Sequence, residues 1–350
     1  MTAKKTGGTG AGGDQFGGAK AGQVARLGTV AIVGTGQVGT MVGCALMAAP
    51  SQAGISSVGL FDAEANVADV ALSLGAGDRV LPDPESVLSA DVVILAMPVG
   101  EIVAWLARFG RRLRQDQLLL DTGSAKTRVA AAMRDHVSPT VRAIGGHPMA
   151  GNEASGPAAA EPGALIGAPF VLSPVRRDEV ALQRASELVR ACAAVPVVID
   201  AEAHDRLVAR TSHLPHLVAS ALANLVVASG EGFVQARALA GSGYRSSTRL
   251  AASDPTMVAG FLDANHQEVR AALDDFRREL NRLVEALDTG PAALEAALAS
   301  ARSWRELVLG GAPGAVVRPA RPEPDRLPGF RRSPYQHGKS RKDAAPRSPG

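Results

Sequence analysis

The segment Gly34-Thr35-Gly36-Gln37-Val38-Gly39 stands between a short apolar stretch, residues 29–33, and a helical pattern. A GxGxxG sequence on its own is weak evidence, because glycine-rich turns are common. Between a strand and a helix, however, Gly34 allows the tight turn, Gly36 lets the backbone approach a pyrophosphate, and Gly39 lets the helix pack closely on the sheet. The segment therefore predicts a dinucleotide-binding unit with the phosphates at the helix N-terminus.

A second candidate cofactor contact is Asp62, which follows a predicted strand at residues 57–61. A carboxylate in this place accepts hydrogen bonds from both ribose hydroxyls and repels a 2′-phosphate, so NAD is favoured over NADP. The alternative is that Asp62 is a turn residue or a helix cap. We expect the cofactor-binding residues to be the three glycines together with Gln37, Val38 and Asp62.

The first half of the chain alternates apolar strand patterns with helical patterns. Strands are predicted at residues 29–33, 57–61, 91–96, 117–120, 141–144, 170–172 and 195–199, and helices at residues 38–49, 63–74, 101–109, 126–134 and 178–193. Near-continuous apolar strands separated by helices are typical of a parallel sheet covered on both faces. The predicted fold class is therefore α/β, with a Rossmann-type dinucleotide-binding domain over residues 29–200.

Strand patterns disappear after about residue 200, and long helices are predicted at residues 201–230, 254–288 and 291–309. Such helices cannot easily bury their apolar faces alone, so the all-helical domain of residues 201–310 is expected to form a homodimer. Pro215 lies inside the first of these helices and cannot donate a hydrogen bond to the carbonyl of Thr211. We therefore expect a kink or a local partner at that point.

Composition limits the class of protein. Hydrophobic residues make up 46% and charged residues 20% of the chain, which allows a sizeable core. Cys44 and Cys192 are the only cysteines, so no disulfide framework is expected and a reducing, cytoplasmic location is favoured. No apolar run is long enough to cross a membrane, and no apolar segment follows Lys4 and Lys5 as a secretory signal would require.

The two ends of the chain differ in composition from the rest. Residues 1–28 are rich in glycine and alanine, and residues 311–350 are rich in proline, arginine and glycine. We interpret them as a disordered leader and a disordered basic tail. Much of the net charge of +3 comes from the tail. A run of this kind is usually a solvated face, so no nucleic-acid or membrane partner is expected.

The polar sequence Asp121-Thr122-Gly123-Ser124-Ala125-Lys126 follows the predicted strand at residues 117–120. Ligands of open α/β sheets bind outside the carboxyl ends of the strands, so Ser124 is placed to hydrogen-bond a substrate hydroxyl. The alternative is that Asp121 or Ser124 caps the following helix, and the two roles can coexist.

A second polar sequence, GGHPMAGNEASG at residues 145–156, also follows a predicted strand. His147 lies here between glycines and a proline, which is not typical of a core histidine, and we interpret it as a loop residue at the sheet edge. The unperturbed histidine pKa, near 6.5, suits proton exchange at neutral pH. His147 is therefore a candidate acid–base residue, and the alternative is a loop histidine without a role.

A third polar cluster joins His204-Asp205 to the sequence SHLPH at residues 212–216. At about 100° per residue, Asp205, Ser212 and His216 share one helix face, whereas His213 points about 80° away. These polar groups need partners in an apolar helix, and a bound anion would be one. Metal binding is the alternative, but the chain has no HExxH-type pattern and no matching cysteine set, so no metal is expected.

In this order, the segments GTGQVG, DTGSAK, GGHPMAGNEASG and HDRLVARTSHLPH resemble the prephenate dehydrogenase family, which also includes arogenate and cyclohexadienyl dehydrogenases. The similarity runs from about residue 29 to about residue 290. It implies a Rossmann domain followed by a helical dimerisation domain, and an NAD-dependent oxidoreductase of tyrosine biosynthesis. The implied reaction is oxidative decarboxylation of prephenate to 4-hydroxyphenylpyruvate, or of arogenate to tyrosine.

The resemblance also implies roles for individual residues. His147 would be the catalytic base, and Ser124 would assist it through the substrate hydroxyl. Arg249 would hold the substrate carboxylate, for which a guanidinium is the natural bidentate partner. The other expected substrate-binding residues are Ser212, His213, His216 and Glu153. Of these, Glu153 can pair with the ammonium group of arogenate.

One position departs from the family pattern, because Ser246 stands where members often carry an aspartate. The substrate therefore stays open, and an amino analogue, 4-amino-4-deoxyprephenate of specialised metabolism, is the alternative. A β-hydroxyacid or imine oxidoreductase is disfavoured by the segments GGHPMAG and SHLPH. A non-catalytic NAD-binding sensor is the alternative from another class, and intact His147, Ser124 and Arg249 argue against it.

Overall fold

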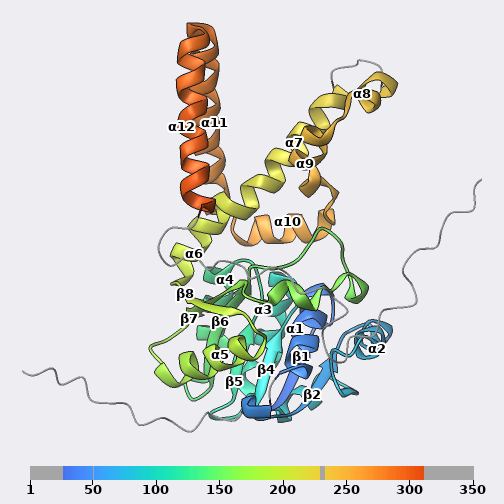
Figure 1. The fold of residues 1–350 in the computed structure, drawn as a ribbon. Helices are drawn as coiled ribbons and strands as arrows, with labels where there is room; N and C mark the ends of the chain where they lie inside the picture. Colours follow the sequence, from blue (N-terminus) through green and yellow to red (C-terminus); the bar gives the residue numbers. More distant parts are fainter. Residues whose placement is uncertain (1–26, 50, 229–232, 311–350) are drawn as a thin grey trace, which may run out of the picture.

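A computed structural model describes residues 27–310 apart from residues 50 and 229–232 (Figure 1). The predicted leader lies outside these residues except for Leu27 and Gly28, and the predicted basic tail lies outside them entirely. The described chain forms a sheet domain followed by a helical region. No helix within the described residues is long and apolar enough to cross a membrane.

The sheet domain contains eight strands in the order β3-β2-β1-β4-β5-β6-β7-β8. They are β1 Gly28–Val33, β2 Ile55–Phe61, β3 Arg79–Val80, β4 Val92–Leu95, β5 Leu118–Asp121, β6 Arg142–Pro148, β7 Pro169–Pro174 and β8 Val195–Val198. The strand order reverses between β1 and β4, which is where open α/β sheets bind their ligands. The predicted α/β class is confirmed. The two-residue strand β3 is too short for a periodic pattern and was not predicted.

One strand pair departs from the predicted parallel sheet, because β6 and β7 run antiparallel. The connection between them has only the short 3-10 turns η4 (Pro157–Ala159) and η5 (Pro162–Leu165), so no crossover helix carries the chain back to the other end of the sheet. The pairing extends β6 as far as Pro148 and places His147 opposite Val171. The prediction that His147 lies in a loop at the sheet edge was therefore wrong.

Helices cover both faces of the sheet, as predicted. They are α1 Gln37–Met47, α2 Ala65–Ser73, α3 Val99–Phe109, α4 Lys126–His136 and α5 Glu179–Ala191. In β1, Val30 and Ile32 pack into a core with α1 and α5, whereas Ala31 and Val33 pack into a second core with α3 and α4. A strand buried on both faces needs apolar residues at every position, which explains its continuous apolar sequence.

The helical region extends away from the sheet domain in two arms, formed by α7 and by the pair α11–α12 (Figure 1). Its elements are α6 Ala201–Val208, a π-helical turn Ala209–His213, α7 Leu214–Ala228, α8 Phe233–Leu239, α9 Ser242–Ser247, the 3-10 turn η7 Arg249–Ala252, α10 Pro255–Ala264, α11 His266–Thr289 and α12 Pro291–Leu309. The single helix predicted for residues 254–288 was wrong, because Asn265 ends α10 and begins α11. Helices α8 and α9 were not predicted.

The π-helical turn ends two residues before Pro215 and is the local adjustment expected from this proline. The hydroxyl of Thr211 donates to the carbonyl of Leu207 at 3.0 Å. The wider turn also changes which side chains share a face. The side chain of Asn265 donates to the backbone oxygen of Asp205 and lies 3.2 Å from Nδ1 of His213. The predicted division of faces assumed regular helix geometry, which the π-helical turn does not keep, so it stays a prediction.

Candidate active site

The glycine loop has the geometry that a dinucleotide needs. Gly34 has a φ of +88°, and a Cβ there would stand 2.5 Å from the carbonyl oxygen of Ala96. A Cβ at Gly39 would overlap the carbonyl oxygen of Gly34, so α1 can approach the strand this closely only with glycine. At Gly36, in contrast, no atom of the described residues lies within 4 Å of the Cβ position, apart from the neighbouring residues of the chain. The backbone at Gly36 is therefore open to a ligand.

The start of α1 and the cavity beside it fit the pyrophosphate and ribose of NAD. No side chain caps the helix and no acidic residue lies in its first turn, so its free N–H groups and positive dipole end can face phosphate. A cavity of about 520 Å³ is lined by Gly34, Gly36 and Asp62. Met97 and Pro98, which follow β4, line the same cavity.

Asp62 also holds the glycine loop itself. One carboxylate oxygen, Oδ2, accepts the backbone N–H of Thr35 at 2.7 Å and its hydroxyl at 3.0 Å. The other, Oδ1, accepts the backbone N–H of Glu64 at 3.1 Å. The turn-residue alternative is thus realised, and the contact of Asp62 with ribose stays a prediction.

The two remaining predicted cofactor residues have other contacts. The side chain of Gln37 donates to Oδ1 of Asn152 at 2.5 Å and to the carbonyl of Ala154 at 3.0 Å, and so ties α1 to the loop after β6. Val38 packs its side chain against the core. Gln37 and Val38 begin α1, and a role of their backbone N–H groups towards the phosphates stays a prediction.

His147 is the next-to-last residue of β6, at the carboxyl end of the parallel strands. Its Nδ1 lies 2.9 Å from Nε2 of His204, and Nδ1 of His204 lies 2.8 Å from Oδ1 of Asp205. His204 and Asp205 are buried, with exposed fractions of 1% and 2%. Because Nδ1 of His147 is engaged in this way, Nε2 is the nitrogen left for a substrate.

The surroundings of His147 keep its imidazole neutral. Burial lowers the pKa of His147 well below the usual 6.5, and neighbouring His204, Lys126 and His213 lower it further, whereas Asp205 acts in the opposite direction. A neutral imidazole at neutral pH can accept a proton. His147 therefore has the protonation state of a general base.

A buried ion pair supports the residue before His147. Nζ of Lys126 pairs with Oδ2 of Asp121 and donates to the carbonyl of Gly146 at 2.5 Å. The other oxygen of Asp121 accepts the N–H of Gly146 at 3.1 Å. The backbone of Gly146 is thus held at both its N–H and its carbonyl.

Ser124 lies between Asp121 and Lys126 and is half-buried. Its hydroxyl has no hydrogen-bond partner among the described residues.

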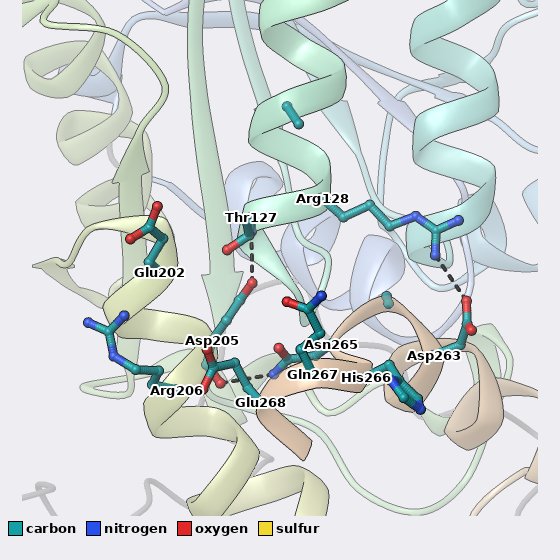
Figure 2. A pocket seen from close by; sticks show the side chains of 12 residues that line it. Thr127, Arg128, Glu202, Asp205, Arg206, Asp263, Asn265, His266, Gln267 and Glu268 are labelled. Carbon is teal, nitrogen blue, oxygen red and sulfur yellow. Dashed lines mark hydrogen bonds and ion pairs between the residues drawn. The ribbon is translucent and has the colours of Figure 1, made fainter. Parts of the chain in front are cut away.

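The cap of α4 comes from a distant residue. Asp205 accepts the backbone N–H of Lys126 at 2.7 Å and that of Thr127 at 2.8 Å. The alternative that Asp121 or Ser124 caps this helix was therefore wrong. Figure 2 shows Asp205 of α6 directed at the start of α4, beside a polar cavity of about 600 Å³.

The predicted carboxylate-binding residue already has an anionic partner. The guanidinium of Arg249, at the start of η7, forms an ion pair with Glu153 from the loop after β6. The side chain of Arg249 is 60% exposed and that of Glu153 is 24% exposed. Ser246 is exposed. Two predicted substrate-binding residues are thus brought together, and a substrate carboxylate would compete with Glu153 for Arg249.

Two of the other predicted substrate-binding residues, His213 and His216, contact Phe261 of α10. The ring of His213 stacks on Phe261 with centroids 4.8 Å apart, and the ring of His216 meets Phe261 edge-on at 5.1 Å. Nδ1 of His216 lies 3.0 Å from the carbonyl of Ser212. Burial lowers the pKa of His213 to about 4. Within the described residues, no group of three or more histidines, cysteines or carboxylates is arranged to hold a metal.

Comparisons with known proteins place the chain in a family. Residues 51–198 match the nucleotide-binding domain of prephenate dehydrogenase, and residues 200–296 match its dimerization domain. A probable prephenate dehydrogenase, NovF, of Streptomyces niveus is 33% identical over 261 residues, covering 74% of this chain and 68% of that protein. The chain belongs to the prephenate dehydrogenase family. The expectation of an NAD-dependent oxidoreductase is confirmed at the level of this family.

Two further relatives cover most of their own length. The cyclohexadienyl dehydrogenase of Zymomonas mobilis is 30% identical over 266 residues, which are 74% of this chain and 88% of that protein. The fold also matches the crystal structure of prephenate dehydrogenase from Aquifex aeolicus with hydroxyphenyl propionate and NAD+, with a TM-score of 0.72. The two sequences are 25% identical. That match covers 80% of this chain and 98% of the other. The Rossmann domain and the helical domain of this prephenate dehydrogenase family member are thus both matched.

Sequence reasoning assigned no role to three residues of this family member's site, namely Lys126, His204 and Asp205. Lys126 ends the DTGSAK segment, and His204 and Asp205 begin the HDRLVARTSHLPH segment, so each stands in a quoted motif. Their contacts join α4, β6 and α6, which no local pattern reveals.

Proposed function

We propose that this enzyme oxidises and decarboxylates a cyclohexadienyl acid, either prephenate to 4-hydroxyphenylpyruvate or arogenate to tyrosine. The observation that carries the proposal is the neutral imidazole of His147 at the carboxyl end of β6, with Nδ1 engaged by His204. The carboxyl ends of parallel strands β1, β4, β5 and β6 share one edge of the sheet, so this imidazole and the glycine loop lie at the same edge.

The chemistry needs one proton acceptor from the protein. A bound nicotinamide ring would accept the hydride from C4 of the substrate. Nε2 of His147 takes the proton of the C4 hydroxyl, so C4 becomes a carbonyl. The C1 carboxylate then leaves as carbon dioxide, and its bonding electrons complete the aromatic ring. Aromatisation drives this step, so neither a metal nor an acid for the leaving group is needed. The C4 oxygen becomes a phenolate and takes back the proton held on Nε2 of His147.

The remaining predicted residues would orient the substrate. We assign Ser124 to the C4 hydroxyl, beside His147, because its half-buried hydroxyl has no partner among the described residues. Arg249 would bind the side-chain carboxylate and would exchange Glu153 for it. Ser212, His213 and His216 would line the side of the site formed by α7 and α10. Holding the ring against the nicotinamide is the main contribution of such residues.

We also propose that the enzyme is a homodimer through the arms of the helical region. The buried core of this region is small and consists of Ala209, Val269 and Ala272. Large apolar side chains on α11 and α12 are left exposed, among them Leu283, Val284, Leu287, Leu298, Trp304 and Leu307. A second copy would cover them, and the match to a dimerization domain supports this arrangement. Light scattering of the purified chain tests the dimer, and a monomer would contradict it.

The deciding experiment is NADH formation at 340 nm with prephenate, with arogenate and with 4-amino-4-deoxyprephenate. We expect turnover of prephenate or arogenate, and loss of at least about 100-fold in kcat for His147→Asn with NAD binding retained. If only 4-amino-4-deoxyprephenate is turned over, that compound is the substrate. This alternative is open because Ser246 stands where family members often carry an aspartate. No turnover of any of the three by folded, NAD-binding protein would overturn the proposed function in favour of the sensor.

A further inference from the structure

The carboxylate of Asp205 is held as an anion at the N-terminus of α4. Burial by itself would raise the pKa of Asp205, but hydrogen bonds from His204 and from the backbone of Lys126 and Thr127 lower it below its ordinary value. The free N–H groups and the positive dipole end of α4 favour a negative charge at this point. Asp205 is therefore an acceptor only, so its bond with Nδ1 of His204 needs a proton on that nitrogen.

The proton on His204 determines the proton on His147. With its proton on Nδ1, His204 can accept a hydrogen bond at Nε2, and this nitrogen lies 2.9 Å from Nδ1 of His147. His147 then donates its Nδ1 proton to His204, which leaves the lone pair of His147 on Nε2. Asp205 at the helix N-terminus thus fixes the tautomer of His204, and His204 in turn fixes the tautomer of His147.

We propose that His204 and Asp205 are positioning residues that hold the proton of His147 on Nδ1, so that Nε2 is the nitrogen offered to the substrate hydroxyl. The inference rests on the proposed function, in which His147 is the base. It assigns no contact between His204 or Asp205 and the substrate.

A purely structural role does not account for this arrangement. Capping α4 needs only the carboxylate of Asp205, which reaches the N–H groups of Lys126 and Thr127 directly. The ring of His204 makes no direct contact with these N–H groups, yet it is buried with both nitrogens engaged. The charged or titratable groups acting on His147 are His204, Lys126, His213 and Asp205, of which only the last favours its protonated form. Asp205 is therefore also the anion that offsets the charge His147 acquires.

The first test reads the tautomer directly by ¹⁵N NMR of the full chain with labelled histidine. The His147→Asn variant assigns the His147 signals among those of the seven histidines. Above the pKa of His147, we expect its Nδ1 to be protonated and its Nε2 to be unprotonated in the unmutated protein. A proton on Nε2 would overturn the proposal, and this measurement needs no variant of His204.

The second test uses His204→Leu and His204→Gln. Leucine fills the space without an acceptor, so we expect the Nε2–H tautomer of His147 to appear and kcat to fall about 100-fold, while KM and NAD affinity change less than about twofold. The side-chain oxygen of glutamine can accept the Nδ1 proton, so His204→Gln should restore the tautomer and most of kcat. His266→Gln, at an exposed position in α11, is the matched control and should behave as the unmutated protein.

The outcomes separate this inference from the proposed function. Equal loss of kcat in both His204 variants, with an unchanged His147 tautomer, would show a structural role and overturn the inference. Retention of kcat within about threefold in His204→Leu would also overturn it. If the unmutated enzyme turns over none of the three cyclohexadienyl acids, the proposed function fails, and the NMR tautomer still decides whether His204 positions His147.

Discussion

Lys126 and Asp121 form an ion pair that solvent does not reach, since both side chains have an exposed fraction of 0%. Burial lowers the pKa of Lys126, while Asp121 and Asp205 favour its charged form. The same ammonium group donates to the carbonyl of Gly146, the residue before His147. The pair therefore joins the end of β5, the start of α4 and the strand that carries the candidate base.

Replacing Lys126 by methionine should destabilise the protein strongly. Removing one partner of a buried pair leaves an uncompensated charge, which costs about 3–5 kcal/mol. We expect a loss of this size in the free energy of unfolding of Lys126→Met, measured with urea. The double variant Lys126→Met/Asp121→Asn removes the stranded charge and should be more stable than the single variant. A loss below about 1 kcal/mol in Lys126→Met would contradict the buried pair.

Two glycines of the loop should respond differently to alanine. At Gly36 the Cβ enters open space and the φ of −64° suits any residue, so Gly36→Ala should fold normally and bind NAD at least about tenfold more weakly. At Gly39 the Cβ would overlap the carbonyl oxygen of Gly34, so Gly39→Ala should lower the midpoint of thermal unfolding. Calorimetric titration with NAD and thermal unfolding of both variants check this. Equal behaviour of the two variants would refute it.

Arg249→Lys should weaken substrate binding more than turnover. Lysine keeps the charge but loses the planar, bidentate contact with a carboxylate. We expect KM to rise about tenfold, with kcat changed less than about threefold. Arg245→Lys, at an exposed position in the neighbouring helix α9, is the matched control and should leave both constants unchanged. An unchanged KM in Arg249→Lys would remove this residue from the site.

His213 should make stability depend on pH in the acid range. Burial lowers its pKa to about 4 from the ordinary 6.5, so the unfolded chain takes up this proton at higher pH than the folded chain does. The contribution of His213 to the free energy of unfolding is therefore full above pH 6.5. It is lost as the pH falls towards 4, and the loss is at most about 3 kcal/mol. Urea unfolding between these pH values should show a smaller loss for His213→Phe than for the unmutated protein. The exposed control His266→Gln should show the full loss.

The sequence by itself determined the sheet domain, because the information that specifies it is local. Strand β4 and residues 30–33 of β1 and 118–120 of β5 are buried and continuously apolar, which can be read without a structure. Gly34 and Gly39 leave no room for a side chain, so the loop sequence itself indicates the turn. The same local reasoning missed β3, which has two residues, and the antiparallel pairing that extends β6 through His147.

Only the tertiary structure decided how the candidate site is assembled. His147 meets His204 from 57 positions away, and Asp205 caps a helix that begins 79 positions before it. The π-helical turn before Pro215 departs from the regular helix geometry on which the predicted faces depended, and His213 lies beside Asn265, 52 positions further along the chain. A motif shows which residue types are present for the chemistry. Which of their side chains contact one another depends on how α6 packs against α4 and β6. That packing is settled by the free energy of the whole fold, since a buried polar group must find a partner wherever the chain brings one.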